Sequence, residues 1–340
     1  MTVFFHLFFI LTGVIFLISQ NHPFCMKRFF LRLSKPGCIL LLLIISFTKA
    51  KGQYYYYNDK YYDNGYIIEI GAGVGGINCL TDIGGNKGIG KKFIKDINWK
   101  NTQLCTTIYA GVLIGNIFGI RLEGSFGKVK AYDSILSKHK DDAATKGRYY
   151  RNLNFRSNIS EFALIAEFHP LMLQDFIDKE PPLFSPYILA GIGRFNFDPE
   201  TYYQGRWVRL HPLRLEGQGF AEYKDRTVYH ISATSFPVGL GVRYELNEKI
   251  VARFEMNHRF TSTDYLDDVS KGVYVDPSLF SKYLSGNDAF LATQLYDRHV
   301  ELDPNYVPAA GDIRGQSKNN DSYFTFNLKV GFTLGRQARN

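Results

Sequence analysis

Three carboxylates stand close together in the segment Phe260–Ser270, which reads FTSTDYLDDVS: Asp264, Asp267 and Asp268. Carboxylate oxygens bind hard cations such as Ca²⁺, and neighbouring acids can exchange protons, so the group could hold a metal or perform acid–base chemistry. A calcium loop, however, places its ligands at every second position, with a glycine between them and a distal Glu. The spacing here suits a turn whose Asp side chains accept backbone N–H bonds, so we predict a turn cap without metal or cofactor.

Signatures of catalytic chemistry are missing from the sequence. It contains no G-x-S-x-G, H-E-x-x-H, Walker A or C-x-x-C motif. The run GAGVGG at 71–76 is only faintly like a phosphate loop, because it lies inside an alternating segment where small residues let neighbouring chains approach. His169, His230 and His258 fall on different predicted elements and do not evidently converge with a serine and an acid. We therefore predict that the chain is not an enzyme.

The first 52 residues differ in composition from the rest. Met26 is followed by basic residues, an apolar run over 38–47 and small residues before Gln53. This order is that of a secretory signal peptide, with Met26 as the true start and cleavage before Gln53. A transmembrane helix over residues 2–19 is the alternative, and it would make the signal after it redundant.

Charge and cysteine content both change once this export segment is removed. Residues 1–52 hold six Lys and Arg and no acid, so the formal charge falls from +8 to +2 and gives no reason to expect a nucleic-acid partner. Cys79 and Cys105 remain. A secreted chain with an even number of cysteines permits a disulfide, and these two flank the first long polar connection. We predict a Cys79–Cys105 disulfide, with two unpaired thiols on opposite strand faces as the alternative.

The remainder of the chain alternates between apolar and other residues. From 323 to 334 every second residue is Phe, Leu or Val, and those between are Tyr, Thr, Asn, Lys or Gly. A period of two with one apolar face is that of a β-strand. The same pattern predicts eight strands, near 66–77, 104–113, 117–131, 154–169, 185–198, 229–246, 249–262 and 322–335.

Short and long connections alternate between these strands. Tight turns are expected at 115–116 and 247–249 and a proline-bearing link at 169–185, whereas the other connections are long and polar, so all long loops lie at one end. Charged residues recur at mid-strand on the polar face, where a soluble sandwich would expose them. We predict the inverse: an all-β, eight-stranded antiparallel transmembrane β-barrel in the outer membrane, with apolar faces toward lipid, charges inward, short periplasmic turns and long extracellular loops.

An eight-stranded barrel has an interior that side chains fill. The charged residues predicted to face it are nearly balanced in sign, so we predict a lumen plugged by paired charges, with a proton or ion pathway as the alternative. The predicted lumen network consists of Glu69, Arg121, Glu123, Glu161, Glu167, Arg194, Arg243, Glu245, Arg253, Glu255 and Arg259.

Several blocks of sequence resemble those of a known family. They are ILAGIGRFNFDP at 188–199, WVRLHPLRLEGQG at 207–219, FPVGLGVRYELNEK at 236–249, FTSTDYLDDVS at 260–270 and the pair Arg314-Gly315. In this order they resemble the blocks of a family of small outer-membrane β-barrels that includes PorG, a barrel of the type IX secretion system. The specific blocks are EGQG and TDYLDDVS, and the second contains Asp264, Tyr265, Leu266, Asp267 and Asp268.

The resemblance implies an outer-membrane location and, for the PorG role, association with secretion-apparatus proteins on the periplasmic side. We expect a signal region over 1–52, a periplasmic arm over 53–65, a barrel over 66–335 and a long extracellular loop over 263–321 within it. The predicted function is a non-enzymatic structural or accessory component of protein secretion whose partners are outer-membrane lipid and periplasmic proteins. Alternatives are a surface receptor or adhesin acting through the long loops, and a hydrolase at the barrel rim.

Overall fold

The computed structural model describes residues 57–58, 61–86, 97–174, 182–271, 273–305, 314–315 and 318–338. All of them belong to one unit, Tyr54–Asn340. The predicted signal region, 1–52, lies outside the described residues. Within the predicted arm, 53–65, the backbone forms strand at 57–58 and from 61 onward.

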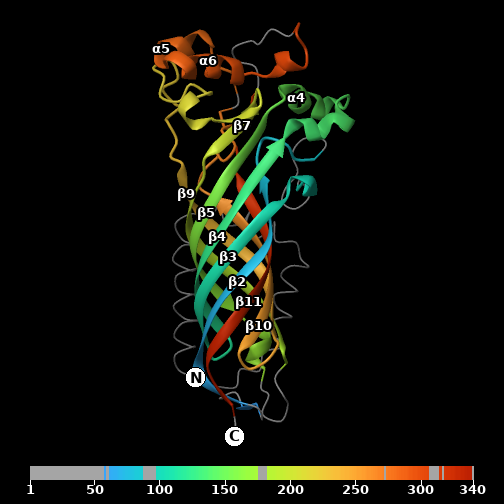
Figure 1. Cartoon of the computed structure of the whole chain (residues 1–340), viewed down its shortest axis with the longest axis vertical. Helices are drawn as coiled ribbons and strands as arrows, with labels where there is room; N and C mark the ends of the chain where they lie inside the picture. The colour runs from blue at the N-terminus through green and yellow to red at the C-terminus, as the bar shows by residue number, and fades with distance from the viewer. Residues whose placement is uncertain are drawn as a thin grey trace, which may run out of the picture. The chain divides into compact units, whose positions relative to one another are not determined.

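Antiparallel strands form a closed barrel (Figure 1). Its eight long strands are β2 (Tyr61–Leu80), β3 (Gln103–Ile114), β4 (Phe118–Tyr132), β5 (Asn154–Phe168), β6 (Phe184–Asn196), β9 (Ser232–Glu245), β10 (Ile250–Thr261) and β11 (Ser322–Ala338). Each strand pairs with the next along the chain, and β11 pairs with β2 to close the wall. The predicted fold is confirmed, and every predicted strand segment is a strand with ends displaced by a few residues. A short β1 (Tyr57–Asn58) pairs with the beginning of β2.

The outward face of the barrel is an apolar belt. Leu122, Phe162 and Leu240 expose 66%, 63% and 65% of their surface, and similar residues follow one another along every strand. Leaving such surface in water costs about 25 cal/mol per Å², whereas lipid tails accept it without penalty. The inward face carries most of the charged residues of the strands and is buried. This distribution places the barrel in the outer membrane, with the belt toward lipid.

Tight turns close one end of the barrel, as predicted. Gly115 and Asn116 have φ of 57° and 58°, and Ile117 N–H donates to the carbonyl of Ile114, as in a type I′ turn. The twist of this turn matches the right-handed twist of the two strands that it joins. At the next turn, Asn247 Oδ1 accepts the N–H of residues 249 and 250. In outer-membrane barrels short turns face the periplasm, so this is the periplasmic end.

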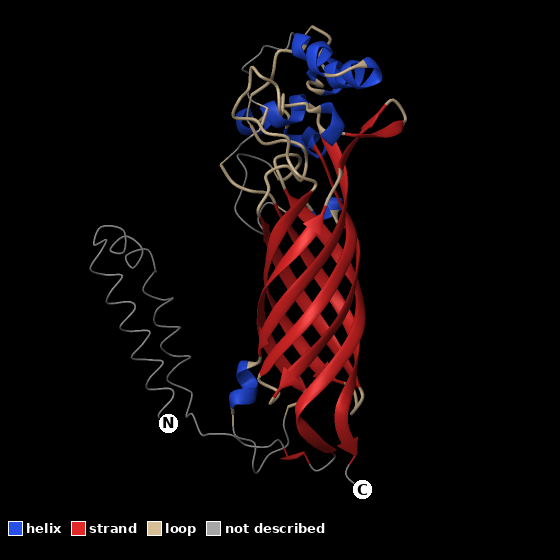
Figure 2. Cartoon of the chain, turned by 90° about the vertical axis from the view of Figure 1, so that its left-hand side faces the viewer, coloured by secondary structure: helices blue, strands red, loops and turns tan. Residues whose placement is uncertain are grey.

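The long connections gather at the extracellular end as a folded layer (Figure 2). We call the described parts of 81–102, 133–153, 197–231 and 262–321 the cap. No helix within the described ranges is long and apolar enough to cross a membrane. The cap contains β7 (Pro199–Tyr203), β8 (Arg206–Arg209), α4 (Ala143–Arg151), α5 (Ser278–Tyr283), α6 (Gly286–Leu295) and the 3-10 helices η2 (Trp99–Asn101), η3 (Asp133–His139), η5 (His211–Leu213) and η6 (His299–Glu301); η4 (Pro170–Leu173) lies in a periplasmic turn.

Two hydrophobic clusters stabilise the cap. The outer one packs β8 and η5 against α5 and α6 through Leu213, Phe220, Phe280 and Leu295, each at most 2% exposed. The inner one lies at the junction of cap and barrel and contains Ile77, Cys79, Ile83, Cys105, Val129, Ala131, Leu153, Phe155, Ile159, Phe195, Phe197, Ala233, Leu266, Val269 and Tyr323. The long connections were predicted only as polar loops. With six and ten residues, α5 and α6 are too short to give a clear helical period.

Candidate functional site

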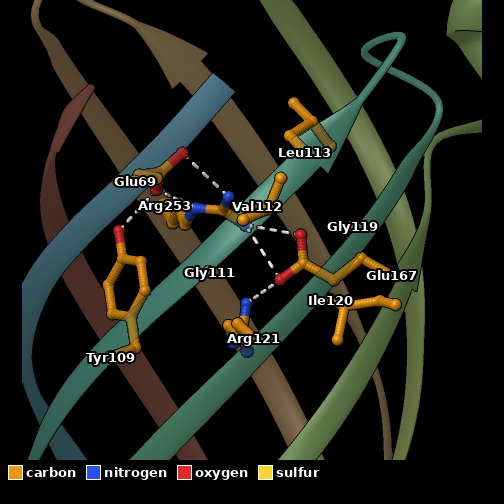
Figure 3. Close-up of a pocket in the computed structure, with 10 residues that line it drawn as sticks. All are labelled: Glu69, Tyr109, Gly111, Val112, Leu113, Gly119, Ile120, Arg121, Glu167 and Arg253. Carbon is orange, nitrogen blue, oxygen red and sulfur yellow. Dashed lines mark hydrogen bonds and ion pairs between the residues drawn. The ribbon is translucent and has the colours of Figure 1, made fainter. Parts of the chain in front are cut away.

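A chain of ion pairs runs through the barrel interior. Toward the periplasmic end, Arg253 of β10 donates to Glu69 of β2 at 2.5 Å and to Glu167 of β5 at 2.9 Å (Figure 3). Arg121 of β4 pairs with the same Glu167, and Tyr109 donates its hydroxyl to Glu69 at 2.6 Å. Because β10 is not a neighbour of β2 or β5 in the sheet, these contacts cross the lumen.

A second group of charges lies nearer the middle of the barrel. Lys329 Nζ of β11 lies 2.5 Å from Glu123 Oε2 and 2.7 Å from Glu255 Oε2. Arg121 Nη2 lies 2.7 Å from the same Glu255 oxygen and so joins the two groups. Lys329 is fully buried and belongs to the network, although it was not among the predicted members. Its signal was present, since it stands on the polar row of the last predicted strand.

A third group lies below the cap. Arg259 Nε donates to Glu161 Oε2 at 2.5 Å, and the hydroxyls of Tyr323 and Ser235 donate to the other oxygen of Glu161 at 2.9 and 2.5 Å. The inner hydrophobic cluster of the cap begins directly above, since Tyr323 belongs to both.

The interior network leaves little free space. A cavity of about 10 Å³ beside Glu69, Arg253 and Glu167 has room for about one water molecule. Burying an ion costs several kcal/mol unless a partner and further hydrogen bonds compensate it, and here each interior carboxylate has a cation nearby. These ion pairs hold opposite walls of the barrel together and fill the lumen.

Arg194 does not join the other predicted network members. It is exposed on the outer face of β6, where its Nε donates to Ser232 Oγ at 2.9 Å, so its predicted inward orientation is wrong. The inward row of β6 contains Gly191 and Gly193, which have no side chain to mark the phase of the alternation. The remaining predicted members face the interior, with Glu245 at the periplasmic rim: Glu69, Arg121, Glu123, Glu161, Glu167, Arg243, Glu245, Arg253, Glu255 and Arg259.

The predicted Cys79–Cys105 disulfide is not formed, and both residues are buried free thiols. The strand register explains this. Cys105 pairs with Gly75, so Cys79 lies four residues further along β2. At about 3.3 Å per residue this is roughly 13 Å, whereas a disulfide needs Cα atoms within about 7 Å. The alternative is therefore right that the thiols are unpaired, but it is wrong that they lie on opposite strand faces, since both lie in the inner hydrophobic cluster.

A Ser–His–Glu arrangement, which was not predicted, lies at the periplasmic end of the interior. His169 Nδ1 is 2.8 Å from Ser185 Oγ, and its Nε2 is 3.3 Å from Glu167 Oε2. These residue types form the relay of serine hydrolases. Here Ser185 is only 2% exposed and Glu167 is already bound by Arg121 and Arg253, so a substrate does not reach the serine. The three side chains fasten the link between β5 and β6.

The acidic segment after β10 lies at the base of the cap. Asp267 accepts the N–H of Ile83 and the N–H of Val269, each at 3.0 Å. Asp268, which has a φ of 65°, accepts the hydroxyl of Tyr229 at 2.7 Å. Both Asp side chains are fully buried, whereas Asp264 is partly exposed. Their contacts are of the kind that a turn cap makes, and Asp267 also fastens the first long connection to the last.

Residues from three of the family blocks meet in one buried contact. Glu216 of EGQG accepts the N–H groups of Ser270 and Lys271 at 3.0 and 2.9 Å. Arg314 donates from Nη1 to Glu216 Oε1 at 2.9 Å and to the carbonyl oxygen of Asp268 at 3.1 Å. We call Glu216, Asp268 and Arg314 the cap clamp. The sequence showed each block separately, but no local period relates positions so far apart.

A second buried pair links the other connections to the clamp. Arg151, the last residue of α4, donates from Nε to Asp133 Oδ2 at 2.9 Å. Its other nitrogens donate to the carbonyl oxygens of Arg314 at 2.7 Å and Asp82 at 2.8 Å. Asp133 in turn accepts the N–H of Gly84 at 3.0 Å. All four long connections of the cap are therefore joined by buried polar contacts.

The surroundings of the acidic segment favour protonated carboxyls. Burial raises the pKa of Asp267 and of Asp268 to about 7 and that of Asp264 to about 8, and neighbouring acids add to the effect. Burial alone would lower the pKa of Arg314, but the carboxylates of Glu216 and Asp268 raise it above its ordinary value. Among the described residues, no group of His, Cys, Asp or Glu has the arrangement of a metal site.

Three solved structures illustrate what the chain is similar to. Ail, the attachment invasion locus protein of Yersinia pestis, in complex with the heparin analogue sucrose octasulfate, matches with a TM-score of 0.34 and 10% identity over 80% of this chain and 100% of that one. The N-terminal β-barrel domain of Pseudomonas aeruginosa OprF matches with a TM-score of 0.30 and 10% identity over 80% of this chain and 99% of that one. The outer membrane protein OprG of the same organism matches with a TM-score of 0.30 and 11% identity over 80% of this chain and 97% of that one. The likeness concerns the fold alone.

No curated protein matches the sequence. The family model described as Domain of unknown function (DUF6089) matches residues 123–292, which is half of the 340-residue chain. The matched range runs from β4 to α6 and includes Glu216 and Asp268 of the cap clamp. This outer-membrane β-barrel therefore belongs to the DUF6089 family.

Proposed function

We propose that this barrel is a non-enzymatic structural or accessory component of protein secretion, in the manner of PorG in the type IX system. The sequence blocks that resemble that family support the proposal. Three of the blocks meet in the cap clamp through Glu216, Asp268 and Arg314, so the resemblance extends to residues that build the fold. The partners are outer-membrane lipid around the belt and secretion-apparatus proteins on the periplasmic side.

The observation that carries the proposal is the filled interior. Arg253 and Lys329 each connect strands across the lumen, and the cavity beside Arg253 has room for about one water molecule. A cargo protein does not pass such a barrel. A role in secretion is then exerted from the surfaces that the barrel presents, as an anchor for other proteins.

The periplasmic end offers such a surface. The pairing of β11 with β2 continues to Ala338 and Tyr61, past the last partners that β3 and β10 provide. With β1 it forms a narrow ribbon beyond the barrel wall. Ribbon edges leave backbone N–H and C=O groups free to pair with a strand of another protein, which supports a periplasmic partner.

A surface receptor or adhesin is the second candidate, and the cap favours it. Loops that only connect strands need no hydrophobic core, but the cap buries Phe280 and Leu295 in its own outer cluster. Such a rigid extracellular layer is suited to present a binding surface.

Export in a deletion strain separates the two candidates. We expect loss of the barrel to reduce the secreted protein pool and wild-type protein to restore it. Purification of the barrel in mild detergent should also recover secretion-apparatus proteins.

Insertion of an epitope tag distinguishes the two ends of the barrel. The same tag is inserted at Glu248 in a periplasmic turn or between Asp303 and Asn305 in the cap. Loss of export with the periplasmic tag alone supports the accessory role. Unchanged export in the deletion strain would contradict it, and loss of surface binding with the cap tag alone would favour the receptor.

Planar bilayers test the closed interior independently. The purified barrel is expected to give no large, stable conductance. A steady open channel would show that the ion-paired interior does not block the lumen, and it would remove the main support for the accessory role.

A further inference from the structure

The apolar belt ends in a basic strip on one side of the barrel. On β4 the outward row contains Phe118, Ile120, Leu122 and Phe126 and then continues as Lys128 and Lys130. On β6 the outward row changes in the same way, from Ile192 to Arg194. We call the outward-facing residues of this region the basic strip: Lys128, Lys130, Arg156, Arg194 and Arg209.

The sheet register places Lys130 and Arg156 side by side, and Arg194 at a position on β5 four residues from Asn158, the partner of Lys128. Lys130 of β4 pairs directly with Arg156 of β5, and Arg194 of β6 lies opposite Phe162 of β5. Like charges directly opposite each other in a sheet are destabilising unless an anion lies between them. A negative group on the outer surface therefore offsets the repulsion.

The chain itself supplies only part of this negative charge. Arg156 pairs with Glu200 at 2.6 Å and Arg209 pairs with Asp198 at 2.7 Å. Five cations against these two acids leave a net charge of +3 on the strip. Trp207 lies against Arg156, with the guanidinium carbon 4.0 Å from the ring centre, so an aromatic ring of the kind found at membrane interfaces borders the strip.

Among the described residues of β9, β10 and β11, the outward positions just above the belt carry no charge. At the corresponding outward positions above the belt, β9 has Thr234 and Ser232, β10 has Ser262 and β11 has Ser322. A general need for solubility would spread charge around the whole rim. The asymmetry points to a ligand that binds on one side.

The depth of the strip matches that of lipid headgroups. From Phe118 to Phe126 the strand advances roughly 27 Å, or about 20 Å along the axis at a tilt of about 40°, which is close to the height of the apolar band in such barrels. Lys128 is the next outward residue on the extracellular side. Its ammonium therefore lies at the level where phosphate groups of outer-leaflet lipids stand.

We propose that the basic strip binds the phosphate groups of an outer-leaflet glycolipid of the lipid A type. The acyl chains lie on the apolar rows of β4, β5 and β6 below Phe126 and Phe162. The phosphates lie between Lys128, Lys130 and Arg194, where they offset the repulsion between neighbouring cations. This site is independent of the proposed role in secretion.

The full-length barrel in uncharged detergent is titrated with lipid A that carries phosphate and with dephosphorylated lipid A. Fluorescence of Trp207 beside Arg156 reports binding, with W99F removing the second tryptophan. We expect saturable binding of the phosphorylated form that weakens as salt rises. In K128E/K130E the affinity should fall by at least about tenfold, on the order of fivefold for each lost charge. The matched control K138E/K140E changes exposed lysines at the end of η3 and should bind normally.

Each outcome decides the assignment. Equal binding of dephosphorylated lipid A, or unchanged binding by K128E/K130E, overturns it. Competition by inorganic phosphate at millimolar concentration would show that the strip binds free phosphate and would overturn its assignment as a lipid A site. If K128E/K130E does not fold, as judged by the gel mobility of the unheated barrel, K128Q/K130Q is measured instead and should still lose several-fold affinity.

Discussion

Arg314 Nη1 and Glu216 Oε1 lie 2.9 Å apart, although 98 positions separate the two residues in the chain. Both are buried, at 2% and 0% exposure. The guanidinium also donates to the carbonyl oxygen of Asp268, so one side chain fixes both the EGQG block and the acidic segment. Because two ions are shielded from water here, each depends on the other for compensation.

Removal of this arginine should loosen the cap and spare the barrel. In Arg314→Met, Glu216 remains buried without its cation, which costs about 3–5 kcal/mol. We expect rapid proteolysis within 262–305 while the unheated barrel keeps its folded mobility on gels. The double variant R314M/E216Q should recover much of the resistance, because it leaves no buried charge unpaired. A cap as resistant in R314M as in wild type would contradict the clamp.

The acidic segment should make the cap more stable at mildly acidic pH than at alkaline pH. An unfolded Asp has a pKa of about 3.9, whereas burial raises the pKa of Asp267 and Asp268 to about 7 and that of Asp264 to about 8. Between these values the folded cap binds more protons than the unfolded one, so its free energy of unfolding falls as pH rises.

Hydrogen exchange of residues 264–271, corrected for the intrinsic pH effect, measures this dependence. Protection should be greater at pH 6 than at pH 8.5, and Asp267→Asn should reduce the difference. Equal or greater protection at the higher pH would mean that the carboxylates are ionised in the folded cap.

Lys329 should be essential to the interior. Lys329→Met removes one of the two cations that Glu123 and Glu255 share, at 2.5 and 2.7 Å, and leaves Arg121 as the other. The interior then holds one more negative charge without compensation, and we expect a loss of about 3–5 kcal/mol in the free energy of unfolding. Urea unfolding from lipid vesicles measures it. The double variant K329M/E123Q should restore part of the loss, and a K329M barrel as stable as wild type would show that Arg121 alone compensates Glu123 and Glu255.

Cys79 and Cys105 of the barrel should stay reduced. Folded protein is expected to resist alkylation at Cys79 and Cys105, because both are buried. After unfolding without reductant, both cysteine peptides should carry the label. Mass spectrometry that finds label only after reduction would instead demonstrate the disulfide.

The belt should respond to charge according to depth. Leu240 lies near the middle of the outward row of β9, and Leu246 directly follows the periplasmic end of that strand. Leu240→Arg should cost about 2–4 kcal/mol and Leu246→Arg about 0–1 kcal/mol, since only the first places a cation at the bilayer midplane. Urea unfolding from vesicles compares them, and equal costs would be inconsistent with the position assigned to the belt.

The strands were predictable because the two faces of the barrel wall have different surroundings, lipid outside and a polar interior inside. Each step along β11 alternates between lipid and interior, so Leu328 and Lys329 differ in character as their surroundings do. The same rule fails where the interior row consists of Gly191 and Gly193, and there the phase of Arg194 was misjudged.

The cap could not be predicted in the same way. Its structure depends on contacts such as Asp267 with Ile83, separated by 184 positions, and Arg151 with the carbonyl of Arg314, separated by 163. No period along the chain encodes such contacts. Likewise, pairing Cys79 with Cys105 required the register of β2 and β3, which the alternation of each strand alone does not determine.

The interior charges are divided unequally along the chain. The first four barrel strands carry four interior acids and one cation: Glu69, Glu123, Glu161, Glu167 and Arg121. The last four carry four cations and two acids: Arg243, Arg253, Arg259, Lys329, Glu245 and Glu255.

Each half of the wall therefore has a charge that suits the other half and repels a copy of itself. When the sheet curls during membrane insertion, the two halves attract, whereas strand exchange that joins like halves of two molecules would bury like charges. The complementary interior charges thus favour closure of the sheet on itself, with one chain per barrel.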